Sequence, residues 1–390
     1  MEYRSGAPVA LSPVRAYDEE LIFSALNEQA RMLGIAETQY AGKRVVIKPN
    51  LVAPSRPDAA ATTHPVFLRA LVRFLRSHGA EQLLLAESPG GPFTEASLRN
   101  NYKVCGILEA AQECGLPLNF DTTSGIVNAP DAYVCRSFSV ITPIREADVI
   151  VDLCKLKSHS LTRMSCAVKN FFGVIPGIEK FAMHSAYPQL DAFSEMIVDL
   201  AAMLCGTHEI LTVCDAIVTM EGNGPTGGRP RPLGAVLMSA SPFCLDAAAE
   251  ELIGFSGTVS ITKCAAKRGL CPASAEELTV LGASLADFRV SDFREPDASS
   301  GKFLRSLPEL FGGRFAAFFS PRPEIDGKRC VGCGVCAASC PQKTVTIVNR
   351  SGKKRARIET KKCIRCFCCQ ELCPIHAVKI RKNPLIALLH

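Results

Sequence analysis

The stretch that decides the C-terminal fold reads Cys330-Val331-Gly332-Cys333-Gly334-Val335-Cys336-Ala337-Ala338-Ser339-Cys340-Pro341. Its cysteine pattern occurs again, at one constant offset, in Cys363-Ile364-Arg365-Cys366-Phe367-Cys368-Cys369-Gln370-Glu371-Leu372-Cys373-Pro374. The apolar residues after each copy repeat at the same offset, with Val345 and Ile347 matching Val378 and Ile380. The C-terminal segment is therefore an internal duplication built around two sets of cysteines.

The spacing of these cysteines points to [4Fe–4S] clusters. Each iron of such a cluster takes one thiolate, and intervals of two residues let a single tight turn reach three corners of the cluster. In bacterial ferredoxins, which carry this run, the fourth cysteine ligates the other cluster. The sequence therefore predicts two [4Fe–4S] clusters, the first held by Cys330, Cys333, Cys336 and Cys373 and the second by Cys363, Cys366, Cys369 and Cys340.

Two other uses of cysteine fit this pattern less well. A zinc site needs pairs of ligands, often with histidine, and has no use for a third cysteine two residues further on. Disulfides are not expected in a chain that has an odd number of cysteines, 19, and no secretory signal. Cys368 departs from the pattern and could compete as a ligand, but we expect it to be a spare thiol packed against a cluster.

Length and composition set the class of protein. At 390 residues the chain is long enough for two or three domains, and 47% hydrophobic with 21% charged residues is ordinary for a globular protein. No stretch approaches the roughly 20 apolar residues of a membrane helix, and the first residues lack the layout of a signal peptide. We therefore expect a soluble cytoplasmic protein with no membrane partner, whose oxygen-sensitive clusters suit an anaerobic or microaerobic host.

The net charge of +6 is concentrated at the C-terminal end, where lysine and arginine outnumber the acidic residues. Part of this excess neutralises the anionic clusters. A basic run is expected at the solvated tip of a hairpin between strands at 344–349 and 355–360, where it could dock an acidic electron donor or acceptor protein. The run consists of Lys353, Lys354, Arg355 and Arg357. Nucleic acid is not an expected partner, because no aromatic residues are interleaved with the run.

The first 320 residues read as alternating strands and helices. Short apolar runs predict strands at 44–48, 83–86, 148–156, 210–218 and 233–239, and helical periodicity predicts helices around 68–75, 94–114, 189–205 and 244–254. This alternation predicts an α/β fold with a mostly parallel sheet and helices on both faces. Residues 1–322 would form this domain and residues 323–390 a small α+β bacterial ferredoxin-like domain, with the apolar segment 302–322 at their interface.

Polar residues gather where the predicted strands end. One strand ends in Lys48 and Asn50. Along another, Lys155, Lys157 and His159 alternate, so that an extended backbone would place all three side chains on one face. Ligands of open α/β sheets bind at the carboxyl ends of the strands. The alternative is that these cations are separate surface residues or partners in structural ion pairs.

We therefore predict one site for a small anion such as a carboxylate or phosphate, where imidazole would supply a proton and a carboxylate would orient a base or bind a metal. The expected catalytic residues are His159, His184 and Glu221. The expected substrate-binding residues are Lys48, Asn50, His64, Lys155, Lys157, Lys169, Asn170, Lys180, Asn223 and Asp246. The remaining cysteines show no paired ligand spacing and are expected to be small buried residues, with a redox role at Cys154 or Cys166 as the alternative.

No Walker loop, dinucleotide fingerprint or nucleophile elbow is present. Six segments instead resemble the domain of unknown function 362 family, whose members commonly carry the same appended ferredoxin. They are Lys48-Pro49-Asn50-Leu51, Thr62-Thr63-His64-Pro65, Lys155-Leu156-Lys157-Ser158-His159, Lys169-Asn170-Phe171-Phe172-Gly173, Glu221-Gly222-Asn223-Gly224-Pro225 and Pro242 to Asp246. The resemblance covers roughly residues 40–255 and departs at Glu87, where the family more often has aspartate. It implies an architecture and a site location but no activity.

Three functions are compatible with these features. The first is a redox enzyme that passes electrons through the ferredoxin domain to or from an anionic small molecule at the strand ends. The second is a non-catalytic electron carrier whose α/β domain docks a partner oxidoreductase. The third is a redox sensor or cofactor-assembly factor. A substrate-sized cationic pocket near a cluster would favour the enzyme, and a flat surface beside an exposed cluster would favour the carrier.

Overall fold

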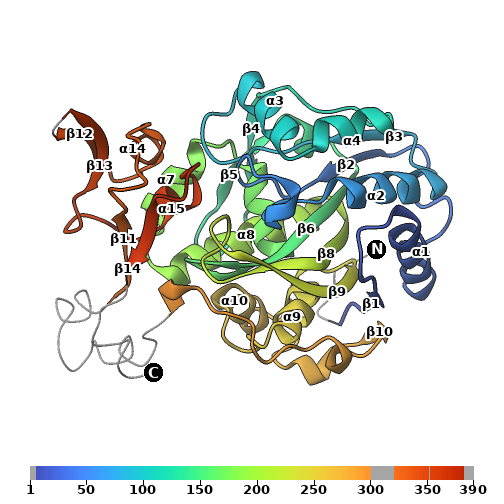
Figure 1. The fold of residues 1–390 in the computed structure, drawn as a ribbon. Helices are drawn as coiled ribbons and strands as arrows, with labels where there is room; N and C mark the ends of the chain where they lie inside the picture. Colours follow the sequence, from blue (N-terminus) through green and yellow to red (C-terminus); the bar gives the residue numbers. More distant parts are fainter. Residues whose placement is uncertain (1–5, 300–319, 351, 382–390) are drawn as a thin grey trace.

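A computed structural model of the chain describes residues 6–299, 320–350 and 352–381. Figure 1 shows a large α/β unit and, beside it, a small unit made of the C-terminal strands β11 to β14 with the short helices α14 and α15. Most of the predicted interface segment 302–322 lies outside the described residues.

The large unit is built on an eight-stranded sheet in the order β10-β1-β9-β8-β6-β2-β3, with β7 pairing to β6. The strands β8, β6, β2 and β3 are parallel, as are β1 and β10, whereas β9 runs antiparallel to both of its neighbours. The bounds are β1 Val9–Pro13, β2 Arg44–Lys48, β3 Gln82–Leu85, β6 Val149–His159, β7 Arg163–Ser165, β8 Glu209–Glu221, β9 Arg229–Ser239 and β10 Val280–Gly282. The prediction of a mostly parallel sheet is confirmed.

The central strand β6 explains the two-layered core. Every residue of β6 is buried, as expected for a parallel strand that is covered on both faces. Val151 and Leu153 contribute to one apolar cluster, and Ile150 and Cys154 contribute to the other. Alternate residues of one strand therefore serve two cores.

Helices cover both faces of the sheet, as predicted (Figure 1). One core is shared with α1 Glu19–Met32, α2 Pro65–Ser77, α3 Glu95–Val104 and α4 Ile107–Glu113. The other is shared with α6 Ala167–Asn170, α8 Leu190–Thr207, α9 Pro242–Leu252 and α10 Ser260–Lys267. The remaining elements are the hairpin β4 Ser124–Asn128 and β5 Ser137–Ile141, the helices α5 Thr142–Arg145 and α7 Glu179–Ala186, and the short turns η1 Pro57–Ala59, η2 Phe171–Val174, η3 Ala275–Glu277, η4 Leu285–Asp287 and η5 Asp297–Ser299.

One detail of the large unit differs from the sequence prediction. The helix expected at 94–114 is divided into α3 and α4 because Gly106 adopts a φ of 72°, a left-handed conformation that glycine accepts readily. The cap of α2 is His64, whose side chain accepts a hydrogen bond from Val66 N. In the described chain no helix is both long enough and apolar enough to cross a membrane.

The small unit repeats a strand-turn-helix pattern, which agrees with the predicted ferredoxin-like α+β fold. Strand β11 Arg322–Ile325 pairs antiparallel with β14 Val378–Arg381, and β12 Val345–Arg350 pairs with β13 Lys353–Ile358. The helices α14 Val335–Ala338 and α15 Cys368–Glu371 each follow a cysteine-rich turn. The basic run is not at the hairpin tip, as was predicted, but within β13, where Lys353 and Lys354 are exposed.

Candidate functional site

Two cavities in the small unit bring the predicted cluster ligands together. One cavity is lined by Cys330, Cys333, Cys336 and Cys373. The other is lined by Cys340, Cys363, Cys366 and Cys369. The fourth cysteine of each motif therefore lies at the cavity of the other motif, in the geometry that ligand exchange between two clusters requires.

Backbone amides and burial act on the sulfurs of these cavities in opposite directions. Cys373 Sγ accepts a hydrogen bond from Ala377 N at 3.2 Å, and Cys340 Sγ accepts one from Thr344 N at 3.3 Å. Burial, together with the charges of Cys373, Cys330 and Cys333, raises the pKa of Cys336 to about 11, which disfavours its thiolate while no metal is bound. Ionising a buried thiol costs free energy, and positively charged iron bound to four such sulfurs would offset that cost. The residues therefore fit [4Fe–4S] clusters.

The two cavities differ in their surroundings. Cys333 is exposed, and its neighbour Val331 is 64% exposed, so the first cavity borders solvent. The second cavity lies next to Cys368, whose thiol donates a hydrogen bond to Cys366. Cys368 lines neither cluster cavity and instead faces a third cavity in the large unit.

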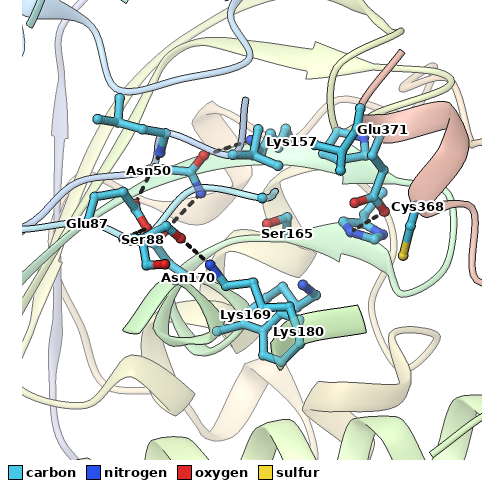
Figure 2. Close-up of a pocket in the computed structure, with 18 of the residues that line it drawn as sticks. Asn50, Glu87, Ser88, Lys157, Ser165, Lys169, Asn170, Lys180, Cys368 and Glu371 are labelled. Carbon is cyan, nitrogen blue, oxygen red and sulfur yellow. Dashed lines mark hydrogen bonds and ion pairs between the residues drawn. The ribbon is translucent and has the colours of Figure 1, made fainter. Parts of the chain in front are cut away.

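This third cavity, which we call the lysine cavity, lies where β2, β3 and β6 end (Figure 2). Its volume is about 80 Å³. It brings together eight of the predicted site residues, namely Lys48, Asn50, Lys157, His159, Lys169, Asn170, Lys180 and His184. Other lining residues include Glu87 and Ser88 after β3, Phe172 and Gly173 in η2, and Cys368, Glu371 and Leu372 from the small unit.

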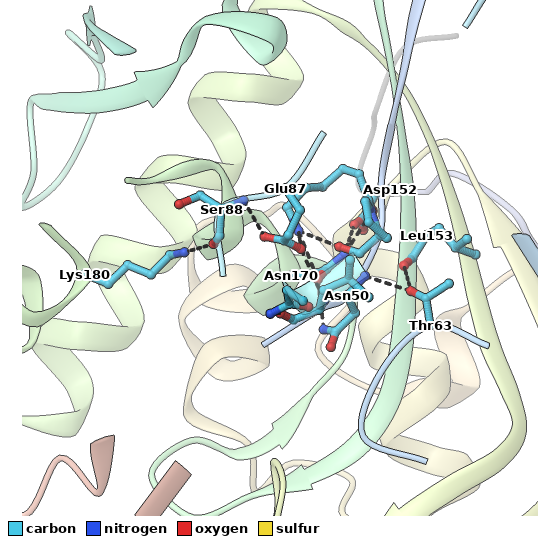
Figure 3. Close-up of polar contacts among 12 residues, drawn as sticks. Asn50, Thr63, Glu87, Ser88, Asp152, Leu153, Asn170 and Lys180 are labelled. Atoms are coloured by element: carbon cyan, nitrogen blue, oxygen red, sulfur yellow. Dashed lines mark hydrogen bonds and ion pairs between the residues drawn. The ribbon is translucent and has the colours of Figure 1, made fainter. Parts of the chain in front are cut away.

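A buried polar network forms one wall of the lysine cavity (Figure 3). Lys48 Nζ lies 2.7 Å from Glu87 Oε2, so these two charges are paired. Asn50 Oδ1 accepts a hydrogen bond of 2.7 Å from Lys157 Nζ, and Asn50 Nδ2 donates one of 2.9 Å to Asn170 Oδ1. Asn170 Nδ2 in turn donates to Asp152 Oδ1 over 2.7 Å. The asparagines therefore fix the lysine side chains relative to the sheet.

Gly173 shows how closely this wall is packed. A Cβ atom at Gly173 would lie 2.3 Å from Glu87 Oε1 and 2.5 Å from Lys48 Nζ. Real Cβ atoms do not approach other atoms so closely, so only glycine fits beside the ion pair. The segment from Lys169 to Gly173 is therefore constrained at both ends, by the cavity and by the Lys48–Glu87 pair.

Burial changes the protonation of the basic groups. The pKa of Lys157 and the pKa of Lys180 are both lowered to about 7, mainly because the charged ammonium loses its water. Desolvation also lowers the pKa of Lys169. The same cause lowers the pKa of His184 to about 3 and that of His159 well below its usual value. At neutral pH both imidazoles are uncharged, while Lys157 and Lys180 are close to half-protonated.

The two histidines are held by different contacts. His159 Nδ1 accepts hydrogen bonds from Leu161 N at 3.1 Å and Thr162 N at 3.3 Å, so its proton is on Nε2. That Nε2 lies 3.3 Å from Glu371 Oε1, and burial raises the pKa of Glu371. His184 stacks on Phe193 with ring centroids 4.4 Å apart.

Lys155 and His64 do not line the lysine cavity. The pairing of β6 with β8 shifts register between Lys155 and Lys157, and Lys155 stays opposite Asp215 within the sheet. Its Nζ lies 2.8 Å from Asp215 Oδ2 and donates to Tyr17 Oη over 2.7 Å, while the ring of His64 stacks on Tyr17 at 3.5 Å. The alternation along β6 predicted that Lys155 and Lys157 share one face and one site. Because the register shifts between them, Lys155 pairs with Asp215 and only Lys157 lines the cavity.

Three further candidates also lie outside the cavity. Asp246 is buried in α9, where its carboxylate accepts hydrogen bonds from Ala167 N at 2.7 Å and Val168 N at 3.2 Å. Glu221 Oε2 accepts from Arg294 N over 3.1 Å. Asn223 is bonded through both ends of its amide to Asp297. These side chains hold the backbone in place and have no free group directed at the cavity.

The loop 221–228 instead holds the small unit against the large one. Gln370 Nε2 donates to Asn223 O over 3.0 Å, and Thr226 Oγ1 donates to Glu371 O over 2.8 Å. On the opposite side of the cavity, a Cβ at Gly90 would lie 2.9 Å from Leu372 Cδ2. Helix α15 therefore borders the lysine cavity, and it brings Glu371, which the sequence analysis did not predict as a site residue.

Comparison with known proteins identifies the family to which this chain belongs. The family model described as domain of unknown function (DUF362) matches residues 45–251, more than half of the chain. The chain belongs to this family. A model described as a 4Fe-4S dicluster domain matches residues 322–374 of this DUF362 protein. It is therefore an iron–sulfur protein with a domain of the electron-transfer type, as predicted.

Two known proteins are similar to parts of this DUF362 chain. A thylakoid-associated protein of Synechocystis sp. is 29% identical over 271 residues, which are 69% of this chain and 81% of that protein. A crystal structure of a protein from Thermotoga maritima is 14% identical with a TM-score of 0.35, and the match covers 59% of this chain and 57% of that one.

Proposed function

We propose that this DUF362 protein is an oxidoreductase that exchanges electrons with a small anion bound in the lysine cavity. The observation that supports this most directly is that one cavity has walls from both units. Lys157 and Lys169 face it from the α/β unit, and Cys368 and Glu371 face it from the cysteine-rich unit. A bound molecule would contact cationic groups on one side and the surroundings of a cluster on the other.

Two [4Fe–4S] clusters, one in each cysteine cavity, would supply one-electron transfer when bound. The second cavity is the one closer to the substrate, because Cys368 contacts Cys366 and also lines the lysine cavity. Cys333 and the exposed Lys353 and Lys354 are on the small unit's surface, where we place the electron donor or acceptor protein. We also propose a cytoplasmic location, where the reducing environment keeps cysteines free of disulfides.

Lys169 is the best candidate for direct contact with the anion. Within the described part of the chain its Nζ has no hydrogen-bond or ion-pair partner, and it lies 4.6 Å from the centroid of the Phe172 ring. Ser88 Oγ, also at this cavity, is buried without a partner. Lys169 is half-buried and Ser88 Oγ is buried, and polar groups that lie away from water are costly when they are unpaired, so a ligand oxygen that bonds to both would stabilise them.

The volume limits the size of the substrate. A water molecule occupies roughly 10–15 Å³ on this measure, so about 80 Å³ holds on the order of five to eight waters. This suits a small carboxylate or an oxyanion, and it is too small to enclose a nucleotide. The charge of the cavity also limits the charge of the substrate, because Lys48 is already paired with Glu87. Lys157, Lys169 and Lys180 remain to balance Glu371 and the ligand.

We assign proton transfer to a lysine in place of a histidine. A general acid works best when its pKa is close to the working pH. Lys157 and Lys180 meet this condition with pKa values of about 7, whereas His159 and His184 stay neutral. His159 would instead remain neutral, with its Nε2 beside Glu371. Helix α15 covers part of the cavity.

Calorimetric titration of the anaerobic, cluster-loaded protein tests the proposal. Sulfate, phosphate and acetate would be titrated into wild type, Lys169→Met and the matched surface control Lys103→Met. A hydrogen bond to a charged group contributes about 1.5–3 kcal/mol, so Lys169→Met should weaken binding by roughly 10- to 100-fold. Lys103 is exposed on α3, and its variant should bind like wild type.

The second candidate function is an electron carrier without a substrate, and exposed Cys333 favours it. The same titration separates the two functions. A carrier would show no saturable anion binding, and Lys169→Met would leave electron transfer to a partner protein unchanged. Extraction of the purified protein followed by mass spectrometry would then identify any small acid that the enzyme retains.

A further inference from the structure

Three cysteines outside the small unit meet in the core of the large one. Cys154 lies on β6, Cys166 precedes α6, and Cys214 lies on β8. Cys166 Sγ is 3.8 Å from Cys154 Sγ and 3.5 Å from Cys214 Sγ, and all three sulfurs lie within 4.8 Å of one another. Each residue is 0% exposed. We call this group the thiol trio.

The fold holds the thiol trio from three directions. Cys154 and Cys214 are register partners in the parallel pair β6–β8, so their side chains lie next to each other. Cys166 follows β7, which pairs back onto β6. Asp246 in α9 then fixes the backbone beyond Cys166 by accepting the amides of Ala167 and Val168. Sequence spacing did not reveal the group, because its members are brought together only by sheet pairing.

Buried polar atoms without partners lie beside the trio. Asp152 and Thr212 are register partners two positions before Cys154 and Cys214, on the same face of the same strands. Asp152 Oδ2 and Thr212 Oγ1 are both buried and have no hydrogen-bond partner among the residues that the structure describes. An unpaired buried carboxylate oxygen is costly. A cation at the neighbouring sulfurs would offset that cost, which an uncharged cluster of thiols does not.

We propose that Cys154, Cys166 and Cys214 form a site for one thiophilic cation, copper(I) or zinc(II). Thiolates select these ions. Zinc–sulfur bonds are about 2.3 Å long, which separates tetrahedral ligands by roughly 3.8 Å, close to the distances in the trio. The described residues add no fourth His, Cys, Asp or Glu to the group. Structural zinc is almost always four-coordinate, so three-thiolate ligation favours copper(I), and zinc would need a fourth ligand from outside the trio, such as water.

The proposed metal site would be connected to the lysine cavity through Asp152, which lies beside the thiol trio. Asp152 Oδ1 accepts a hydrogen bond from Asn170 Nδ2, and Asn170 holds Asn50 in the cavity wall. Binding releases protons from the thiols, since the thiolate is the ligand. Because Asp152 bonds to Asn170, a bound ion would also help to fix the polar side chains beneath the cavity. This proposal does not depend on the reaction that the cavity carries out.

Metal analysis of the anaerobic, cluster-loaded protein tests the site. Mass spectrometry of metals should find about one equivalent of copper or zinc per chain in addition to iron, after exposure to either ion and gel filtration. Cys166→Ala and Cys214→Ser should each lose that equivalent while iron and sulfide stay constant. Cys205→Ala is the matched control, because Cys205 is a buried cysteine of the same core outside the trio.

X-ray absorption at the copper or zinc edge of wild type should report sulfur neighbours, three for copper and three plus an oxygen for zinc. This measurement supports the site even if a cysteine variant folds poorly. Wild-type protein that retains neither metal while its iron is complete would overturn the proposal. So would a metal that stays bound in Cys166→Ala or that departs in Cys205→Ala.

Discussion

Glu371 Oε1, in the cysteine-rich unit, lies 3.3 Å from His159 Nε2 at the end of β6. This contact joins the segment that carries the second cluster-ligand set to the strand that carries Lys157. It shows that the two units share one site and are not simply tethered to each other. The predictions below address the charges, the ligand sets and the packing of that site.

The buried lysines should make stability depend on pH above neutrality. Folded Lys157 has a pKa of about 7, and its ordinary value is 10.5. Between these values the unfolded chain binds more protons than the folded chain, so the free energy of unfolding rises with pH. In buffer without added oxyanions, the melting temperature of wild type should increase from pH 7 to pH 9, and it should increase less in Lys157→Met. Equal slopes in the two proteins would contradict the depressed pKa.

Replacing Cys368 should alter a cluster without removing it. Its thiol donates a hydrogen bond to Cys366, and hydrogen bonds to cluster sulfurs help to set the reduction potential. Cys368→Ala should keep full iron and sulfide content, and potentiometry should show one reduction step shifted to lower potential. Cys114→Ala, a half-buried cysteine far along the chain, serves as the control. Loss of iron in Cys368→Ala would show instead that Cys368 is a ligand.

Alkylation can test whether the fourth cysteine of each motif ligates the cluster of the other motif. In Cys373→Ser the cysteines of the first motif, Cys330, Cys333 and Cys336, should become reactive to iodoacetamide, because they share a cavity with Cys373. Cys363 and Cys366 should stay protected. In Cys340→Ser the pattern should reverse, and peptide mass spectrometry would record both patterns. Exposure of each motif by loss of its own fourth cysteine would refute the assignment.

Gly173→Ala should damage the cavity wall. The added methyl group would meet Glu87 and Lys48, and overpacking of this kind costs about 1–3 kcal/mol. We expect a lower melting temperature and weaker anion binding at unchanged iron content. Gly206→Ala in α8 is the matched control, because nothing lies within 4 Å of its added Cβ. Similar melting temperatures for the two variants would show that the wall relaxes around the methyl group.

Local sequence patterns were sufficient for much of this architecture. The strands β2, β3, β6 and β8 were predicted because each is a short apolar run, and the cysteine cavities follow from ligand spacing. The strand β1 and the edge strand β10 were not predicted, since strands of five and three residues carry little periodic signal. Lys48, Lys157 and Lys169 were predicted to share a site because parallel strands end at one edge of the sheet.

The errors concern contacts that no local pattern encodes. Lys155 looks equivalent to Lys157 in sequence, but only the pairing with β8 shows that Asp215 faces the first and the cavity faces the second. Glu371 lies within a cluster motif, so its place beside His159 depends on how the two units dock. The thiol trio likewise depends on the register of β6 with β8.

The position of α15 across the lysine cavity has a consequence for how the molecule is made. The α/β unit is synthesised before the helix that borders the cavity, because that helix comes from residues 368–371. The cysteines on either side of the helix would fix its path more firmly once they have acquired iron and sulfide. The pocket that we propose for a small anion is thus completed only after the α/β unit has been made, and a chain that fails to acquire its inorganic sulfur would be left with an unfinished site.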